Sequence, residues 1–264
     1  MHLYGDGLAA AFTQCCIVYY MGAAILHYVL PVLLPRPSVQ KGHPKQGQVL
    51  KESIMSIGAL LVKALVLTAV EKLHAAGYGK LYTGSIHSVS DVTYAVTTIV
   101  ILDCLHDTWF YWTHRLLHWK PLYRHIHYIH HKSTVPTPFA GYSFHVVEAL
   151  IVFANEIIVC FLFPIHASLH RIYHLFTTLI HIGGHAGYEM APLIPSVEQA
   201  LSWLVQGPRP CGALNTVKHH DMHHQIPTVH FALYFVHWDR LCGTEHPAYR
   251  GYARKLAAQG QEKS

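Results

Sequence analysis

One uncharged stretch limits the fold of this chain more than any other feature. Residues 8–35 are mostly apolar and contain no Lys, Arg, Asp or Glu. As a helix, this stretch is long enough to cross the roughly 30 Å hydrocarbon core of a bilayer. A cleaved signal peptide would have basic residues in front of its apolar part, whereas Asp6 is the charged residue found there. We therefore expect a helix that stays in the membrane.

Further apolar stretches follow, and the composition agrees with a membrane protein. Charged residues make up 12% of the chain, against about 25% in an ordinary soluble domain. The last two stretches are separated by little more than residues 164–168, which predicts a helical hairpin. The expected fold is an all-α membrane protein with four to five hydrophobic helices. The later stretches are residues 54–70, 92–112, 146–165 and 169–182.

The basic residues predict the orientation in the membrane. Loop 36–51 and segment 113–143 each contain four Lys or Arg, and short loops rich in these residues stay in the cytosol. Both segments would then be cytosolic, together with the last third of the chain, and the N-terminus would lie outside. Since the basic residues lie between apolar stretches, they favour contact with anionic lipid, and we predict no nucleic-acid partner.

Histidine is unusually common, at 25 of 264 residues. Four groups of histidines have spacings of three or four residues, which place the rings on one face of a helix. All four groups lie at or just beyond predicted cytosolic helix ends, and so form a histidine-rich helical cap there. The groups are His114 and His118; His127, His130 and His131; His181 and His185; and His220, His223 and His224.

These spacings predict a metal site. One pair of histidines four residues apart often arises by chance, but ten neutral imidazoles beside a bilayer are costly unless something satisfies them. Metal coordination does so. Because zinc takes four ligands and octahedral iron six, ten histidines fit two ions with about five each. Imidazole binds iron, zinc or copper, so ligand type leaves the metal open.

Other catalytic motifs are missing from the sequence. The soluble di-iron pattern needs paired ExxH helices, and its single match, Glu71 and His74, lies in a predicted outer connection without a partner. The chain has no HExxH motif, nucleophile elbow, phosphate loop or dinucleotide fingerprint. An oxidation reaction would therefore need electrons from a separate protein.

The order HxxxH, HxxHH, HxxxH, HxxHH resembles the fatty acid hydroxylase superfamily, which includes sterol desaturases, sterol C4-methyl oxidases, cholesterol 25-hydroxylase and sphingolipid hydroxylases. The resemblance covers about residues 90–246, and segments 107–115, 123–127, 215–224 and 231–244 also carry it. We expect residues 1–89 to be membrane-anchoring helices, 90–247 to be the catalytic domain, and the polar tail 248–264 to be disordered.

The resemblance implies that all ten grouped histidines are metal ligands and that no catalytic residue acts beyond the metal centre. His219 is an alternative to His220, because His219 also lies four residues before His223. The family pattern favours His220.

Several further residues are expected beside the metal site. Ligating imidazoles need acceptors for their second N–H, and Asp107, two helical turns before His114, could be one. His145 and Glu148 stand where relatives often carry His-Pro-x-Glu. The expected neighbours are Asp107, His145, Glu148, Glu189, Asp221 and His219, with Asp239 and Tyr188 as further candidate acceptors.

The resemblance also implies a function. It indicates a multi-pass monooxygenase that holds two iron ions (Fe²⁺/Fe³⁺, with zinc able to replace them in purified protein) and hydroxylates a sterol, fatty acyl or sphingoid lipid with O₂. The implied electron donor is cytochrome b5 with its reductase. In a eukaryote the enzyme would lie in the endoplasmic reticulum, with its metal site facing the cytosol.

Three other functions stay open. A lipid desaturase of the sterol C5 type would use the same centre. A membrane metal transporter would also need buried ligands, although transporters place them near the bilayer midplane on broken helices. A catalytically silent relative could bind lipid or act as a scaffold, but the complete histidine pattern disfavours this.

Overall fold

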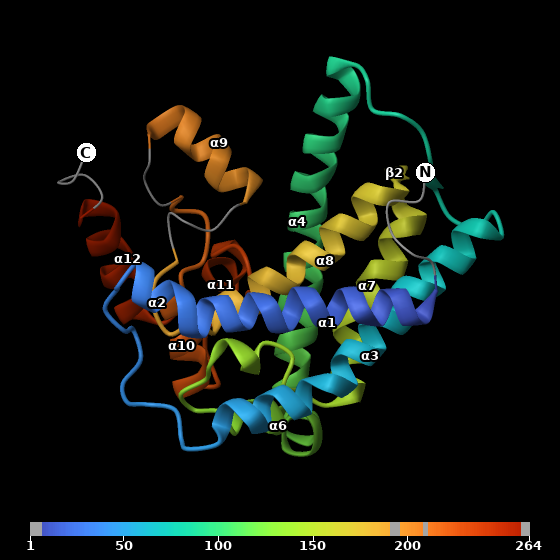
Figure 1. Ribbon diagram of the computed structural model, residues 1–264. Helices are drawn as coiled ribbons and strands as arrows, with labels where there is room; N and C mark the ends of the chain where they lie inside the picture. The colour runs from blue at the N-terminus through green and yellow to red at the C-terminus, as the bar shows by residue number, and fades with distance from the viewer. Residues whose placement is uncertain (1–6, 191–195, 208–210, 260–264) are drawn as a thin grey trace.

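The computed structural model describes residues 7–190, 196–207 and 211–259. This described part of the chain is mostly helical, with one short parallel pair of strands, β1 (Leu81–Tyr82) and β2 (Ile165–His166) (Figure 1). The helices are α1 (Leu8–Ala24), the π-helical turn η1 (Ile25–Val29), α2 (Leu30–Leu33), α3 (Gln48–Ala75), α4 (Val89–Leu117), α5 (Lys120–Leu122), the π-helical turn η2 (Tyr123–His127), α6 (Tyr128–His131), the 3-10 turn η3 (Pro138–Ala140), α7 (Val146–Leu162), α8 (Ala167–Gly184), α9 (Val197–Gln206), α10 (Val217–Gln225), α11 (His237–Leu241) and α12 (Pro247–Gln259).

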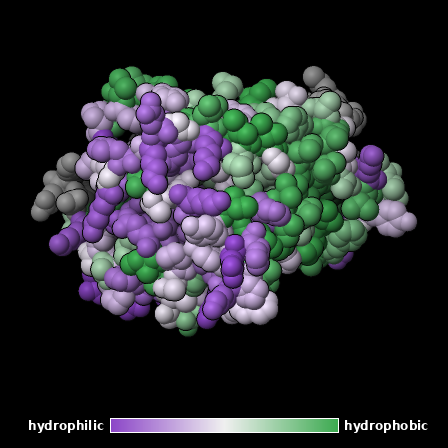
Figure 2. Space-filling model, turned by 90° about the horizontal axis from the view of Figure 1, so that it is seen from below, coloured by the Kyte–Doolittle hydropathy of each residue, from purple (hydrophilic) through white to green (hydrophobic). Residues whose placement is uncertain are grey.

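Three helical segments are long and apolar enough to cross a membrane. They are Leu8–Leu33, which comprises α1, η1 and α2, together with α3 and α4. The predicted hairpin is also present, because α7 and α8 are joined through β2. On the face seen in Figure 2, hydrophilic residues gather on one side and hydrophobic residues on the other. The expected all-α membrane fold is confirmed.

The N-terminal helices share one hydrophobic core with the later helices. Helix α3 packs against α1 and α7, and α1 packs against α8. A Cβ atom at Gly22 would lie 2.6 Å from Cδ1 of Ile182, so glycine is what lets α1 lie this close to α8. The buried Tyr19 hydroxyl hydrogen-bonds the Ser56 hydroxyl and donates to the Phe139 carbonyl, which ties α1, α3 and η3 together. Helices α1 and α3 therefore form part of the folded core and also belong to candidate membrane spans.

The long helix α4 begins with a capping box. The Ser88 side chain accepts a hydrogen bond from the Asp91 backbone N–H, and the Asp91 carboxylate accepts one from the Ser88 N–H. These two bonds satisfy donors that a helix N-terminus leaves unpaired. From this cap, α4 runs without a break to Leu117, so its last turns carry His114 to the predicted metal site.

Two sequence expectations about helix limits are wrong. Residues 248–259, expected to be disordered, belong to α12, whose Tyr249 ring is buried against those of His219 and His230. Residues 260–264 of the same tail lie outside the described residues. Glu71, expected in a loop, lies near the end of α3, where it pairs with Arg171. Tertiary packing therefore supplies order that the local polarity of these segments does not predict.

A buried ion pair joins two of the core helices. Lys63 of α3 and Glu156 of α7 are fully buried, and the ammonium nitrogen lies 2.6 Å from a carboxylate oxygen. The ammonium group also lies 4.6 Å from the centre of the Phe153 ring, which favours a cation. Because both charges are removed from water, each one is stabilised mainly by the opposite charge of its partner.

We predict that Glu156→Leu lowers the free energy of unfolding by about 3–5 kcal/mol, because it leaves the Lys63 charge buried without a counter-ion. The double variant Lys63→Met/Glu156→Leu should recover most of this loss, since it removes both charges. Thermal unfolding of the purified protein in detergent measures both. A double variant as unstable as the single one would contradict this account of the pair.

Candidate metal centre

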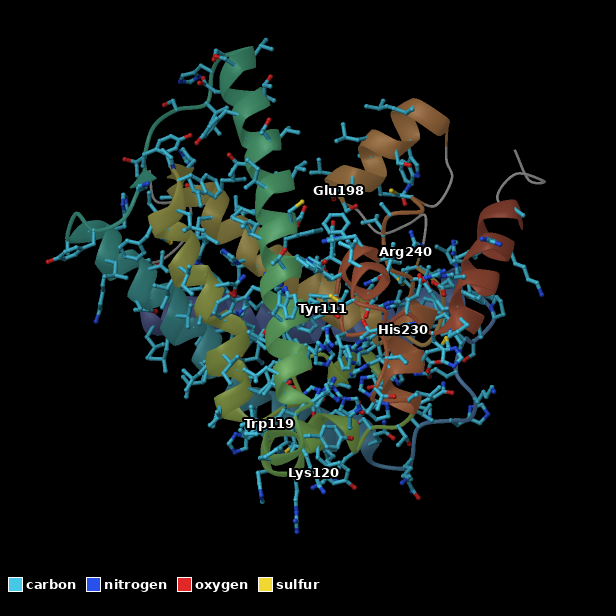
Figure 3. All side chains as sticks on the ribbon, turned by 180° about the vertical axis from the view of Figure 1, so that it is seen from behind. Tyr111, Trp119, Lys120, Glu198, His230 and Arg240 are labelled. Atoms are coloured by element: carbon cyan, nitrogen blue, oxygen red, sulfur yellow. The ribbon has the colours of Figure 1, made fainter. Side chains whose placement is uncertain are left out.

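Four helical segments bring histidines together at one end of α4. His114 lies in the last turn of α4 and His118 follows it, while η2 and α6 carry the second group. His185 ends α8, and α10 carries the last group. Side-chain nitrogen atoms gather between α4 and the C-terminal helices, in the region where Tyr111 and His230 lie (Figure 3).

The structure brings nine of the ten predicted histidines into two groups that could each hold an ion. Within each group, all the potential ligand atoms lie within 4.8 Å of one another. On α10, and likewise on η2–α6, the two histidines four residues apart belong to one group. The histidine between them, three residues after the first, belongs to the other group. The group of five is His114, His118, His127, His131 and His223, and the group of four is His130, His185, His220 and His224.

The spacing of the ring nitrogens fits metal coordination. In the group of five, Nε2 of His127 lies 3.1 Å from Nε2 of His114 and 3.1 Å from that of His131. In the group of four, the Nε2 atoms of His185 and His220 are 2.9 Å apart. With a metal–nitrogen bond of about 2.1 Å, neighbouring ligand atoms are about 3.0 Å apart in an octahedron and about 3.4 Å apart in a tetrahedron. These distances are close to the octahedral spacing, whereas the 3.4 Å between Nε2 of His185 and Nε2 of His130 equals the tetrahedral one, so spacing leaves the metal open.

The contacts of the Nδ1 atoms explain why a cation would stabilise each group of Nε2 atoms. Nδ1 of His114, His223 and His185 lies 2.7–2.8 Å from the carbonyl oxygens of residues 231, 229 and 181. A carbonyl only accepts, so each Nδ1 carries the proton and, in the neutral ring, Nε2 carries a lone pair. Lone pairs that face one another across about 3 Å repel unless a cation lies between them. The donor set therefore fits two metal ions.

Burial keeps these rings neutral. Removal from water holds the pKa of His130, His220 and His224 well below the ordinary histidine value, and neighbouring imidazoles lower it further. The same causes lower the pKa of His118 to about 2. Neutral imidazole is the form that binds metal.

Two of the histidines that the sequence offers as ligands, His181 and His219, lie outside both groups. His181, the tenth predicted ligand, contacts the Thr177 carbonyl through Nδ1, and its buried Nε2 has no hydrogen-bond partner among the described residues. Its ring packs edge-on against His106. His219, the alternative to His220, lies 3.2 Å from Asp239 and stacks on His230. His220, rather than His219, thus lies in a group that could hold a metal ion.

Of two predicted neighbours, Glu148 contacts a grouped histidine, whereas His145 caps a helix. A Glu148 carboxylate oxygen lies 2.8 Å from Nδ1 of His127, and both side chains are buried. The carboxylate therefore orients this ring and makes its other nitrogen a better donor to metal. His145 caps the N-terminus of α7, where its Nδ1 accepts a hydrogen bond from the Val147 N–H.

The remaining predicted neighbours are acidic residues that hold the backbone near the centre. Asp107 accepts hydrogen bonds from the backbone N–H groups of residues 233–235, and none joins it to a grouped histidine within the described ranges. Glu189 accepts from the N–H groups of Val217 and Lys218, at the start of α10. Asp221 pairs with Lys218. Glu189 thereby fixes the helix that carries three of the grouped histidines.

Asp239, one of the further candidate acceptors, contacts the backbone close to the centre. Its carboxylate accepts hydrogen bonds from the N–H groups of Phe231 and Ala232. The carbonyl of Phe231 in turn accepts from His114, so Asp239 fixes the backbone group that orients this histidine. The acceptors at residues 229, 231 and 181 are backbone carbonyls, which no residue identity could have revealed.

An apolar cavity reaches the group of four. Its volume is about 330 Å³, and it lies between the end of α1, η1 and α2 on one side and α8 on the other. Residues 214–217, just before and at the start of α10, and residues 233–234 complete the wall, and His220 lies at its edge. The candidate centre is therefore open to an apolar ligand.

Fold and site define a helical membrane protein with two buried histidine groups compatible with metal binding. The chain belongs to the fatty acid hydroxylase family, whose model matches residues 99–244. It is 27% identical to lathosterol oxidase of Rattus norvegicus over 92% of this chain and 78% of that protein. It is 28% identical to a Delta(7)-sterol 5(6)-desaturase of Gibberella zeae, covering 76% and 53%, and 26% identical to cholesterol 25-hydroxylase of Rattus norvegicus, covering 86% and 74%.

These relatives identify the chain as an oxidoreductase, as the sequence predicted. No match was found among solved structures.

We predict that each histidine group holds one ion. The purified protein should contain about two ions, and both His127→Ala/His131→Ala and His220→Ala/His224→Ala should retain about one, because each pair belongs to one group. Metal analysis by mass spectrometry measures the content. The exposed His125→Ala is the control and should keep both ions. Two ions retained in either double variant would contradict the grouping.

We predict that Glu148→Gln weakens the binding of one ion about 10–100-fold, because an amide orients His127 less firmly than a carboxylate. Competition with a chelator measures both affinities. His145→Ser, which keeps a helix-capping side chain three residues away, should change neither. Equal weakening of both ions by Glu148→Gln would show a general structural effect instead.

Proposed function

We propose that the chain is a membrane-bound, O₂-dependent oxygenase that holds two iron ions and hydroxylates a sterol. The observation that carries this proposal is that nine imidazole donors lie in groups of five and four, and that one of them, His220, lines an apolar cavity. Five and four donors are fewer than the six that octahedral iron takes, which allows O₂ or water to bind beside them.

Iron bound in this site supplies the oxidising power that an unactivated C–H bond requires. The chain's own residues do the rest. Glu148 and the carbonyl of Phe231 hold His127 and His114 in fixed orientations. The apolar wall of the cavity excludes water from the bond to be oxidised. The balanced reaction joins the lipid C–H, O₂, two electrons and two protons to give an alcohol and water.

The relatives' names support a sterol as the lipid, since the three compared proteins are an oxidase, a desaturase and a hydroxylase of sterols. A sterol partitions into the bilayer, and the cavity lies beside the membrane segment Leu8–Leu33. The substrate would therefore enter sideways from the membrane. In a eukaryotic cell we place the protein in the endoplasmic reticulum, with the histidine-rich end toward the cytosol.

The electron donor would meet the tip of the molecule beyond α4. Trp119 and Lys120 lie at this tip (Figure 3), and Arg115 and Arg124 are also exposed. His118, one residue before Trp119, belongs to the group of five, so the path from this surface to a metal ion is short. A basic surface favours an acidic donor such as cytochrome b5 with its reductase.

Desaturation is the second candidate, because the same hydrogen removal followed by a second one gives an alkene. One compared relative is named a desaturase. A metal transporter fits less well. Its ligands would lie near the bilayer midplane, whereas these histidines gather at the ends of α4 and α8.

The test of this proposal is product analysis in membranes that contain the protein. We expect membranes supplied with lathosterol, reductant and ¹⁸O₂ to form a sterol alcohol that contains ¹⁸O. His130→Ala/His131→Ala should abolish the product, because it removes one donor from each group, whereas His125→Ala should not. Mass spectrometry identifies the products. An alkene without labelled alcohol would establish the desaturase, and unchanged sterol would contradict both candidates.

A further inference from the structure

One side chain in the wall of the apolar cavity has unsatisfied hydrogen-bonding groups. Both the Oδ1 and Nδ2 atoms of Asn215 are buried without a partner among the described residues. The other polar side chains of the wall are paired: Tyr234 with Glu198, Thr216 with Tyr249, and His220 within its metal-binding group. A buried amide without partners costs free energy, so turning this amide toward the cavity to reach the hydroxyl of a ligand would be favourable.

The backbone holds Asn215 firmly in place. Its N–H donates to the carbonyl of Tyr234 at 2.8 Å, and Leu214 and Phe235 form a bridge beside it. The next residue, Thr216, caps α10, and His220 follows within the same helix. The amide and a candidate metal ligand therefore line the same cavity from two fixed positions five residues apart.

We propose that Asn215 binds the hydroxyl group of the sterol and so determines which end of the molecule is oxidised. This proposal rests on the proposed function. A sterol has one hydroxyl, on its first ring, and the rest of the molecule is apolar. With the hydroxyl bound to Asn215, the first rings lie beside His220 and the hydrocarbon side chain points away from the metals. The carbon oxidised is then one near the hydroxyl, in the first two rings.

The rest of the cavity wall suits the hydrocarbon part. It includes the apolar residues Ile25, Leu26 and Leu30 of η1 and α2, and Phe176 and Leu179 of α8. Ile25 belongs to a candidate membrane span and is exposed.

Helix α9 lies near the cavity, because its Glu198 accepts a hydrogen bond from the hydroxyl of Tyr234, which lines the cavity. The helix exposes Leu204 by 83% and Val205 by 89%, as expected of a helix that lies in a membrane surface. Glu198 lies at the end of α9 that faces α4 (Figure 3).

The closing experiment compares lathosterol with its analogue that lacks the hydroxyl. Asn215→Leu keeps the side-chain size and removes both hydrogen-bonding atoms. We expect it to weaken equilibrium binding of lathosterol at least about tenfold and to leave binding of the analogue unchanged, so the preference for the hydroxyl is lost. Equal weakening for both sterols, or no change for either, would overturn the role of Asn215.

A second variant tests the cavity itself. Nothing lies within 4 Å of a Cβ atom built on Gly183, which lines the cavity. Gly183→Leu should therefore fill the space and weaken binding of both sterols, while Gly251→Leu, at an equally open position on α12, should not. Undiminished sterol binding by Gly183→Leu would overturn the assignment of the cavity.

The position of oxidation completes the test. Wild-type enzyme should modify lathosterol in its first two rings, and oxidation of the side chain would overturn the proposed orientation. Sterol binding that discriminates the hydroxyl without any oxidation would retain the role of Asn215 in binding and contradict the proposed function. Oxidation together with equal binding of the two sterols would support the proposed function and contradict the role of Asn215.

Discussion

The repulsion between imidazole lone pairs is the constraint on which the rest of this structure depends. Backbone carbonyls bind the Nδ1 protons of His114, His185 and His223, so their Nε2 lone pairs point into two small volumes. Protonation would relieve the repulsion, but burial opposes it. Two cations would satisfy all nine rings at once. Metal binding would therefore stabilise the convergence of the helices that carry these rings.

The elements around the candidate centre hold the histidine-bearing helices close together. Glu189 fixes the start of α10, Asp107 fixes residues 233–235, and Asp239 fixes the carbonyl that orients His114. These carboxylates act on the backbone rather than on the metal ligands. The N-terminal helices close the other side, because α1 packs against α8 and η1 forms part of the cavity wall. Membrane anchoring and the candidate site thus belong to one packed unit.

The spacing of histidines predicted that ten of these side chains lie near one another, and nine of them form two compact groups. On α10, the two rings four residues apart belong to the same group, and the ring at offset three belongs to the other. Spacing could not reveal that His181 packs against His106 instead of joining a group, because this contact joins segments far apart in the sequence. It also could not show that Asp107 binds backbone amides. The order of α12 comes from Tyr249 packing on His219, a contact between segments that local polarity does not encode.

The most direct measurement of the central claim is anomalous X-ray scattering at the iron edge from crystals of the protein purified with its metal. The account predicts two iron peaks. One should be bonded to His114, His118, His127, His131 and His223, and the other to His130, His185, His220 and His224. A single peak, or a peak bonded to His219 or located outside both groups, would contradict it.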